Sequence, residues 1–218
     1  MNVHVQRLVT SGTFSLDGGT WEVDNNVWIV GDENQVVVID PAHDAEAVAA
    51  AVAGREVTAI LLTHGHDDHI RYAREASGLL GGAPIHLNPA DRMLWDEVFG
   101  DESPDHDIAD GQVFTIAGVE LVALSTPGHS PGSTCFYADS GVVGPDIAGP
   151  VLFSGDTLFQ GGPGATGRSY SSFDEIIESI RGVLFGLPDE TVVLTGHGDA
   201  TTIGDERPHL QEWIDRGH

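Results

Sequence analysis

Apolar and polar positions along the chain follow two different periods. Short apolar runs at 36–40, 57–62 and 151–153 are typical of buried strands, and each ends at a polar or glycine-containing segment. Helical spacing follows some of these runs: an alanine-rich helix is expected over 45–53, and apolar residues recur three and four apart over 173–187. The alternation of strands and helices predicts an α/β fold.

The same reading places the remaining elements. Further strands are expected at 3–9, 27–30, 84–87, 113–116, 119–124, 133–138 and 192–194. Further helices are expected from 69 to about 80, at 89–98 and at 206–216, and the polar stretch 100–111 is expected to be a surface loop. Strand-rich halves with helices outside favour four layers, helix–sheet–sheet–helix, over a single doubly wound sheet.

Charge and composition narrow the classes of partner. Nine arginines and no lysine stand against 34 acidic residues, which gives a formal net charge of −25. Nucleic-acid backbones and anionic lipid surfaces need clustered cations, so neither is expected as a partner. No apolar run reaches the roughly 20 residues of a membrane span, and the first ten residues lack a signal-peptide pattern. We therefore expect a soluble, cytoplasmic protein acting on a small molecule, and the sequence indicates no oligomeric state.

The densest group of polar side chains directly follows the apolar run 57–62. Three histidines and two aspartates lie within Thr63-His64-Gly65-His66-Asp67-Asp68-His69. Polar groups at the end of a buried strand are where α/β enzymes bind their ligands. Imidazole and carboxylate suit zinc, iron or manganese, so we expect a metal site here rather than an exposed polar loop.

Three later segments end apolar runs in the same way. They are Thr126-Pro127-Gly128-His129-Ser130, Ser154-Gly155-Asp156-Thr157 and Thr195-Gly196-His197-Gly198. A glycine before each candidate ligand lets the backbone approach a metal without a Cβ clash. Any one of these segments is a weak signal, but the four together fit a site for two metal ions.

This set of motifs resembles the metallo-β-lactamase superfamily. HxHxDH at 64–69, followed by PGH, GD and GHG, is similar to the pattern of its glyoxalase II-like hydrolases, over essentially the whole chain. The stretches GDTLFQGGPGATGRSYSSF and LPDETVVLTGHGDATTIGDERPHLQEW look similar to a narrower group of small hydrolases associated with mycothiol. The resemblance implies the αβ/βα four-layer sandwich of that superfamily, in agreement with the layers expected above.

The resemblance also implies which residues hold metal. A first ion would be bound by His64, His66 and His129, and a second by Asp68, His69 and His197. The carboxylate of Asp156 would bridge the two ions. Two divalent ions are implied as cofactors, zinc foremost, with iron or manganese as alternatives. Asp68 and Asp156 are the expected catalytic residues, together with a hydroxide that bridges the metals.

The implied function is hydrolysis of a thioester of a low-molecular-weight thiol by that hydroxide. Metal binding lowers the pKa of water toward ~7, so that hydroxide is present at neutral pH. Since a thiolate is a good leaving group, no strong general acid is needed.

Departures from glyoxalase II bear on the substrate. That enzyme carries a C-terminal helical domain with basic residues for the carboxylates of glutathione, whereas a single domain over 1–218 without that addition is expected here. A lysine-free chain of charge −25 is poorly suited to an anionic tripeptide, so a mycothiol-type thioester, which is essentially uncharged, is favoured. Arg168 and Tyr170, after the glycine-rich stretch that follows Asp156, are candidate substrate-binding residues, and Arg71 is a further candidate for holding a carboxylate.

Other reactive residues have simpler interpretations. Asp67 is expected to orient a ligand histidine rather than to take part in catalysis. The single cysteine, Cys135, is expected in the core, since Asp156 already matches the bridging position. Six histidines match no ligand motif and are expected at the surface or in satisfied interior positions: His4, His43, His86, His106, His209 and His218.

Three alternative functions remain at this stage. A persulfide dioxygenase on the same fold would use a single iron held by His64, His129 and Asp156 to activate oxygen. A lactonase would use the same hydroxide on a cyclic ester. A metal-retaining binding protein is disfavoured by the full set of ligands.

Overall fold

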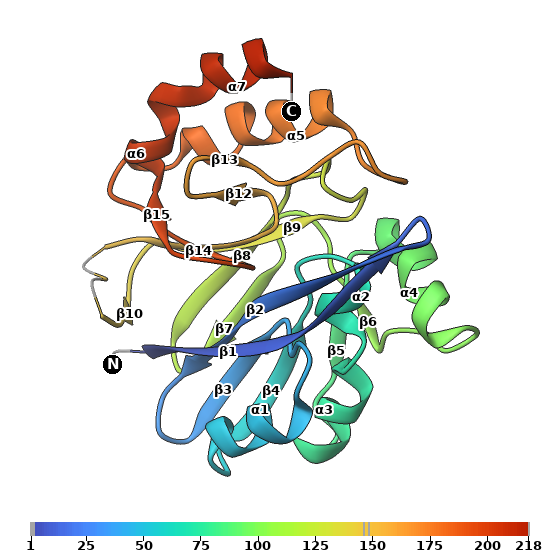
Figure 1. Cartoon of the computed structure of the whole chain (residues 1–218). Helices are drawn as coiled ribbons and strands as arrows, with labels where there is room; N and C mark the ends of the chain where they lie inside the picture. The colour runs from blue at the N-terminus through green and yellow to red at the C-terminus, as the bar shows by residue number, and fades with distance from the viewer. Residues whose placement is uncertain (1–2, 146, 148, 218) are drawn as a thin grey trace.

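Two β-sheets lie face to face, and helices cover the outer face of each sheet (Figure 1). The computed structural model describes residues 3–217 except 146 and 148. From the bottom of Figure 1 to the top, the layers are helix, sheet, sheet and helix. The α/β four-layer sandwich expected from the sequence is confirmed.

The first sheet is mixed and has seven strands in the order β10-β1-β2-β3-β4-β5-β6. In that order the strands are Val142–Val143, Val3–Leu16, Gly19–Gly31, Gln35–Ile39, Glu56–Leu61, Ile85–Leu87 and His106–Asp107. Strands β1 and β2 form one long antiparallel hairpin, and β3 to β6 run parallel.

Side chains of the first sheet alternate between its two faces. Val36 and Val38 pack toward the outer helices, whereas Val37 and Ile39 pack toward the other sheet. This period of two is that of a strand buried on both faces. The helices on this side are α1 (Ala45–Val52), α2 (Asp67–Ile70), α3 (Ala73–Leu79), the 3-10 helix η1 (Pro89–Asp91) and α4 (Arg92–Phe99).

The second sheet has six strands in the order β15-β14-β11-β9-β8-β7. In that order they are Thr201–Thr202, Val192–Thr195, Val151–Gly155, Thr134–Ala138, Val119–Ser125 and Val113–Ile116. Beyond it lie the short hairpin β12 (Leu158–Phe159) and β13 (Gly162–Pro163), and the helices α5 (Phe173–Gly182), η2 (Leu184–Gly186), α6 (Ile203–Glu206), η3 (Arg207–His209) and α7 (Leu210–Arg216).

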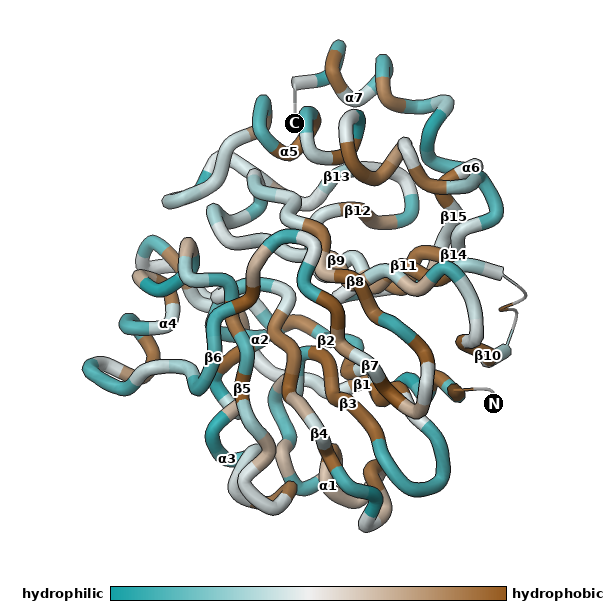
Figure 2. Tube along the Cα trace, turned by 180° about the vertical axis from the view of Figure 1, so that it is seen from behind, coloured by the Kyte–Doolittle hydropathy of each residue, from teal (hydrophilic) through white to brown (hydrophobic). Residues whose placement is uncertain are grey.

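Apolar side chains fill the space between the two sheets and under the helices. Trp28, Phe136 and Phe153 lie in the central core, and Ile176, Ile180 and Trp213 bury the apolar faces of α5 and α7 against the second sheet. The hydropathy of the chain follows the same division, with apolar segments along the central strands (Figure 2). No helix among the described residues is both long and apolar enough to span a membrane.

Several elements differ from the sequence-based expectations. The expected strands 3–9 and 27–30 are parts of the much longer hairpin β1–β2, and the expected loop 100–111 contains the short strand β6. The expected helix 173–187 ends at Gly182 and continues as a 3-10 turn, and the expected helix 206–216 is divided among α6, η3 and α7. The propensity and spacing of apolar residues located these regions, but hydrogen bonding within the folded chain set their ends.

Candidate metal centre

The seven predicted ligands converge at one end of the sandwich. They come from the loop and helix after β4, the β8–β9 loop, the residue after β11 and the loop after β14. Their ligand atoms form overlapping groups whose members lie within 4.8 Å of one another. Segments separated by as many as 128 residues are thus brought together in space.

The first of these groups, here called the three-histidine group, consists of His64, His66 and His129. The distance from His66 Nδ1 to His64 Nε2 is 3.1 Å, and that to His129 Nε2 is 3.0 Å. All three rings are buried. Three imidazole nitrogens aimed at one point are the donor set of a transition-metal or zinc site.

The second group, here called the mixed group, consists of Asp68, His69 and His197. His69 Nε2 lies 3.4 Å from Asp68 Oδ2 and 3.3 Å from His197 Nε2. His197 Nε2 lies 3.4 Å from Asp68 Oδ2. A carboxylate oxygen and two imidazole nitrogens therefore face one another at nearly equal distances.

Asp156 lies between the two groups. Its Oδ2 is 3.6 Å from His129 Nε2 and 3.2 Å from His197 Nε2, so one oxygen faces both groups. Its other oxygen, Oδ1, is buried without a hydrogen-bond partner among the described residues. Asp156 is therefore the candidate for a carboxylate that bridges two ions.

These distances fit metal ions. Four tetrahedral ligands at about 2.1 Å from an ion lie about 3.4 Å from one another. The separations within the mixed group and to Asp156 range from 3.2 to 3.5 Å.

The second nitrogen of four of the ligand histidines is hydrogen-bonded. His64 Nδ1 lies 3.0 Å from Thr63 Oγ1, and His69 Nδ1 lies 2.9 Å from Asp40 Oδ2. The Nδ1 atoms of His129 and His197 each lie 2.8 Å from a backbone carbonyl, that of Ala165 and that of Asp24 respectively. Each acceptor holds the proton on Nδ1 and leaves Nε2 free to bind a metal.

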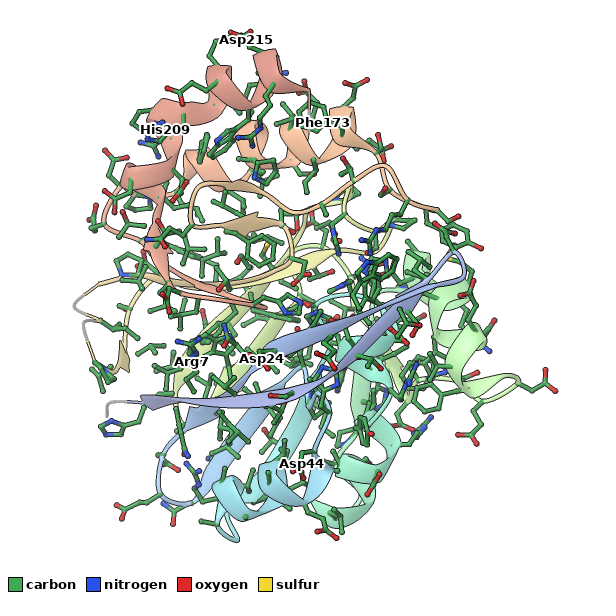
Figure 3. The ribbon with its side chains drawn as sticks, in the orientation of Figure 1. Arg7, Asp24, Asp44, Phe173, His209 and Asp215 are labelled. Atoms are coloured by element: carbon green, nitrogen blue, oxygen red, sulfur yellow. The ribbon has the colours of Figure 1, made fainter. Side chains whose placement is uncertain are left out.

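The long hairpin contributes to this arrangement. Asp24 lies on β2 near the centre of the molecule (Figure 3), where its carbonyl accepts the bond from His197. On the same strand, Asn25 Nδ2 donates to Asp68 Oδ2 at 3.0 Å, and Asn25 Oδ1 lies 2.8 Å from His43 Nε2. Asn25 and His43 thus orient Asp68, although no sequence motif singled them out.

The pKa values of the histidines are shifted in opposite directions in the two groups. Burial, together with the neighbouring histidines, lowers the pKa of His66 to about 3 and that of His64 well below its usual value. The three-histidine group therefore has at least two neutral imidazoles, which is the form that binds a metal.

The carboxylates reverse this trend in the mixed group. Although burial disfavours its charged form, the nearby charges of Asp68 and Asp156 raise the pKa of His69 to about 9. The same carboxylates raise the pKa of His197 to about 11. Burial alone would raise the pKa of Asp68, but the opposite charge of His69 and the hydrogen bond from His197 hold it at about 2. Without metal, these two histidines therefore keep protons that an ion would displace.

Close backbone approach explains two of the motif glycines. A Cβ on Gly196 would lie 2.2 Å from Asp156 Oδ1, and one on Gly128 would lie 2.2 Å from the backbone nitrogen of Ile176. Gly128 also has φ of +137°, a conformation that other residues rarely adopt. Glycine is thus required at both positions, but because neighbouring protein atoms leave no room for a Cβ rather than because of an approach to a metal.

A pocket of about 420 Å³ opens onto both groups. Ligand residues of both groups and Asp156 line one side of it. Its other walls are mainly apolar and come from the hairpin and from the segment after β11: Phe14, Trp21, Val23, Phe159 and Ala165. The site therefore combines a polar floor with walls suited to an apolar or uncharged group.

Of the two candidate substrate-binding residues, Arg168 lines this pocket and Tyr170 does not. The Arg168 guanidinium lies 4.0 Å from the ring centre of Trp21 and 4.9 Å from that of Phe14. Within the described residues, no side chain or carbonyl is hydrogen-bonded or ion-paired to it. Tyr170 is 47% exposed, and its hydroxyl lies 3.4 Å from Glu97 Oε1 on α4.

Three other sequence interpretations can be compared with the structure. Asp67 does not orient a histidine: its Oδ1 accepts from the Ser15 backbone at 2.9 Å, and its Oδ2 pairs with Arg71. Because strand β1 of the hairpin lies beside this loop, the Asp67 carboxylate faces the hairpin instead of a ligand histidine. Cys135 is buried in the core under α5, and burial raises the pKa of its thiol to about 11, as expected of a packing residue. His218 lies outside the described residues.

Serine chemistry has no support in the site. The segment 128–132 has the spacing Gly-x-Ser-x-Gly, but Ser130 is fully buried and its hydroxyl donates to Asp91 at 2.7 Å. A nucleophilic serine needs an exposed hydroxyl next to a base, so Ser130 is a structural residue.

Comparison with known proteins agrees with this geometry. A family model described as "Metallo-beta-lactamase superfamily" matches residues 20–197, a span that includes all seven predicted ligands. Hydroxyacylglutathione hydrolase GloC from Haemophilus influenzae is 31% identical over 190 residues, which cover 81% of this chain and 86% of that protein.

Solved structures show the same fold. The BLEG-1 B3 metallo-beta-lactamase superposes with a TM-score of 0.74 at 28% identity, covering 92% of this chain and 98% of that one. The protein TTHA1623, solved in a di-iron-bound form, superposes with a TM-score of 0.67 at 30% identity, covering 85% and 93%.

Proposed function

Since the chain belongs to the metallo-beta-lactamase superfamily, we propose that it is a dinuclear metal-dependent hydrolase that cleaves thioesters of a low-molecular-weight thiol. The observation that carries the proposal is the position of Asp156 Oδ2, 3.6 Å from His129 Nε2 and 3.2 Å from His197 Nε2. One carboxylate oxygen shared by two donor groups is suited to two ions, each held by its own group.

Ions bound at both groups would supply a hydroxide nucleophile at neutral pH and a Lewis acid that polarises the thioester carbonyl. His64, His66 and His129 would hold one ion, and Asp68, His69 and His197 the other. We propose zinc for both positions, because zinc is commonly bound by imidazole nitrogens and carboxylate oxygens. The di-iron form of TTHA1623 makes iron the principal alternative.

The protein side chains have two tasks in this reaction. Asp68 and Asp156 supply the negative charge that holds the ions at the pocket floor, which is why we assign them the catalytic role. Phe14, Trp21 and Phe159 line the pocket and pack against the substrate, which contributes to its binding. Because a thiolate is a good leaving group, this reaction needs no strong general acid.

The name of one relative supports thioester hydrolysis. GloC, 31% identical, is named as a hydroxyacylglutathione hydrolase, and that substrate is a thioester. A dioxygenase with one iron would need only His64, His129 and Asp156, and would leave the mixed group without a role. A lactonase would share the metal centre and differ only in the substrate.

For the thiol carrier, we propose a mycothiol-type molecule with little or no charge. Apart from the candidate ligands, the pocket lining holds one carboxylate, Asp24, and one cation, Arg168, among the described residues. Such a pocket can pair one carboxylate with Arg168, while a further carboxylate would meet the like charge of Asp24. Low-molecular-weight thiols act inside cells, so the proposal places the protein in the cytoplasm.

The test is a panel of thioesters of mycothiol, glutathione and coenzyme A, assayed with metal-loaded and chelator-treated protein. We expect hydrolysis by the metal-loaded form only, and loss of at least one bound ion together with activity in His129→Ala. Hydrolysis of a lactone but of no thioester would assign a different substrate class. Full metal occupancy in His129→Ala would refute the assignment of the centre.

A further inference from the structure

Asp91 is a buried carboxylate that lies outside the four ligand segments but contacts two of them. It is the last residue of η1 and is fully buried. Its Oδ2 accepts hydrogen bonds from the Gly65 backbone nitrogen and from Ser130 Oγ, each at 2.7 Å. Its Oδ1 accepts from the Gly132 backbone nitrogen at 2.5 Å.

The three donors belong to the two loops that supply the three-histidine group. Gly65 lies between His64 and His66, on the loop after β4 of the first sheet. Ser130 directly follows His129 on the β8–β9 loop of the second sheet, and Gly132 lies two residues further on. One carboxylate therefore joins loops from different sheets at the point where their imidazoles meet.

Both loops pack directly against the carboxylate-bearing residue. A Cβ on Gly132 would lie 2.7 Å from Asp91 Cγ, and one on Gly65 would lie 3.0 Å from Asp91 Cβ. Ser130 Oγ is itself held 2.9 Å from Ser133 Oγ. These contacts leave the Asp91 carboxylate little freedom to move relative to either loop.

The usual structural role of an aspartate at this position is not used. Asp91 occupies the N-cap position of α4, yet its side chain makes no capping hydrogen bond to that helix. An N-cap aspartate ordinarily accepts from a backbone N–H of its own first turn. Here the carboxylate turns away from its helix, and its three hydrogen bonds all go to the ligand loops.

We propose that Asp91 is a positioning residue for the three-histidine group: its carboxylate fixes the separation between His64 and His66 on one loop and His129 on the other. The proposal rests on the metal centre of the proposed function and deepens it. Side chains hydrogen-bonded to metal ligands typically contribute 10–100-fold to metal affinity, and we expect an effect of that size for a carboxylate bonded to the residues beside the ligands.

The test compares Asp91→Asn with the wild type. If the asparagine oxygen faces Gly65 and Ser130, its amide group faces the Gly132 N–H, so a donor opposes a donor. We expect an approximately 10–100-fold weaker affinity for one of the two ions and less than a twofold change for the other, measured by titrating chelator-treated protein with Zn²⁺ against a chromophoric chelator. Reference titrations of His129→Ala and His197→Ala identify which position each dissociation constant describes.

A second readout needs no metal. Hydrogen exchange of the backbone amides of Gly65 and Gly132 in the metal-free protein should be faster in Asp91→Asn, because both amides lose or weaken their bond to the carboxylate. A milder variant, Ser130→Ala, removes one donor and keeps both amide bonds. It should show a smaller loss of affinity, again confined to the three-histidine position, and it carries the test if Asp91→Asn does not fold.

The matched control is Glu206→Gln. Glu206 is also a buried carboxylate that accepts from one backbone nitrogen, that of Gly161 at 3.0 Å, and one hydroxyl, that of Thr201 at 2.6 Å. Both substitutions should lower the melting temperature, because each disturbs a buried carboxylate. Glu206→Gln should nevertheless leave both metal affinities unchanged.

Equal loss at both metal positions in Asp91→Asn, or wild-type affinity at both, would overturn the positioning role while leaving the dinuclear centre intact. If the wild-type protein bound no divalent ion, the proposed function itself would be overturned, and this inference with it.

Discussion

Individual side chains in the metal centre are oriented by atoms that no ligand motif contains. Asp40 fixes His69 through a bond of 2.9 Å, and Asn25 fixes Asp68 through one of 3.0 Å. Asp40 also accepts the Thr63 backbone N–H at 2.8 Å and the Thr63 hydroxyl at 2.6 Å. The site is therefore largely preorganised before an ion arrives, which reduces the entropy that binding must overcome.

The opposed titration of the two ligand groups predicts a maximum in the stability of the metal-free protein near pH 6.5. As pH falls below the ordinary histidine pKa of 6.5, the unfolded chain takes up protons that buried His64 and His66 refuse, so stability is lost. As pH rises above 6.5, folded His69 and His197 keep protons that the unfolded chain releases, so their contribution is lost toward pH 9 and beyond.

Thermal unfolding of chelator-treated protein between pH 5 and 9 measures this dependence. Metal-loaded protein is the control, and its alkaline decline from these histidines should vanish because the ion has displaced their protons. A melting temperature of the metal-free protein that climbs steadily to pH 9 would contradict the arrangement of charges described here.

The sequence was sufficient to identify the seven candidate ligands, because they stand in short motifs at the ends of apolar runs. It did not identify Asp91, Asn25 or Asp40. Each is one of many isolated polar residues, and its partners are between 18 and 43 positions away along the chain. Their roles depend on which loops the fold brings together, and a single sequence does not contain that information in local form.

Among the elements, the hairpin β1–β2 has the greatest influence on the pocket. Near its tip, the Asp17 carboxylate accepts from the Ser169 backbone nitrogen at 3.0 Å and from its hydroxyl at 2.6 Å. Phe14 and Trp21 pack on the neighbouring Arg168. The N-terminal hairpin and the segment after β13 therefore form one wall of the pocket between them.

Removal of the Trp21 ring should weaken substrate binding without changing the chemistry. A cation–π contact with Arg168 contributes on the order of 1 kcal/mol, so Trp21→Ala should raise KM about fivefold and leave kcat within about twofold. Steady-state kinetics with a thioester substrate provides the measurement, and Val9→Ala, at another exposed apolar position on the hairpin, is the matched control. An unchanged KM in Trp21→Ala would show that this wall does not contact the substrate.

The length of this hairpin could not be predicted from the apolar pattern. Residues 10–15 and 17–22 are mostly polar or partly exposed, so they lack the alternation that marks a strand with one buried face. Backbone pairing along the two strands, from His4 with Gly31 to Leu16 with Gly19, holds the hairpin together where side-chain burial does not. The parallel strands β3 and β4 were predicted well because both their faces are buried.

On the scale of the whole molecule, the four-layer arrangement followed from the sequence because strands and helices alternate with distinct periods. The convergence of loops from both sheets on one candidate metal centre was expected only from the resemblance of the motifs. Charge is the other property that belongs to the molecule as a whole, since −25 acts on every approaching ligand.

This charge predicts a dependence of carrier preference on salt. Thioesters of mycothiol should have a higher kcat/KM than those of glutathione at low ionic strength, because the carboxylates of glutathione are repelled by the chain. The difference should shrink as salt screens the repulsion over a Debye length of about 10 Å at 0.1 M. Equal or greater efficiency with S-lactoylglutathione at low salt would contradict the carrier preference and leave the hydrolase assignment in place.

The central claim is that two ions, held by two groups that share Asp156, support hydrolysis. The most direct test is to add metal stepwise to chelator-treated protein and to follow thioester cleavage with oxygen excluded. We predict that activity reaches its plateau at two equivalents of metal per chain and needs no oxygen. A plateau at one equivalent of iron, with oxygen consumed in each turnover and none of the thioester hydrolysed without it, would contradict the account.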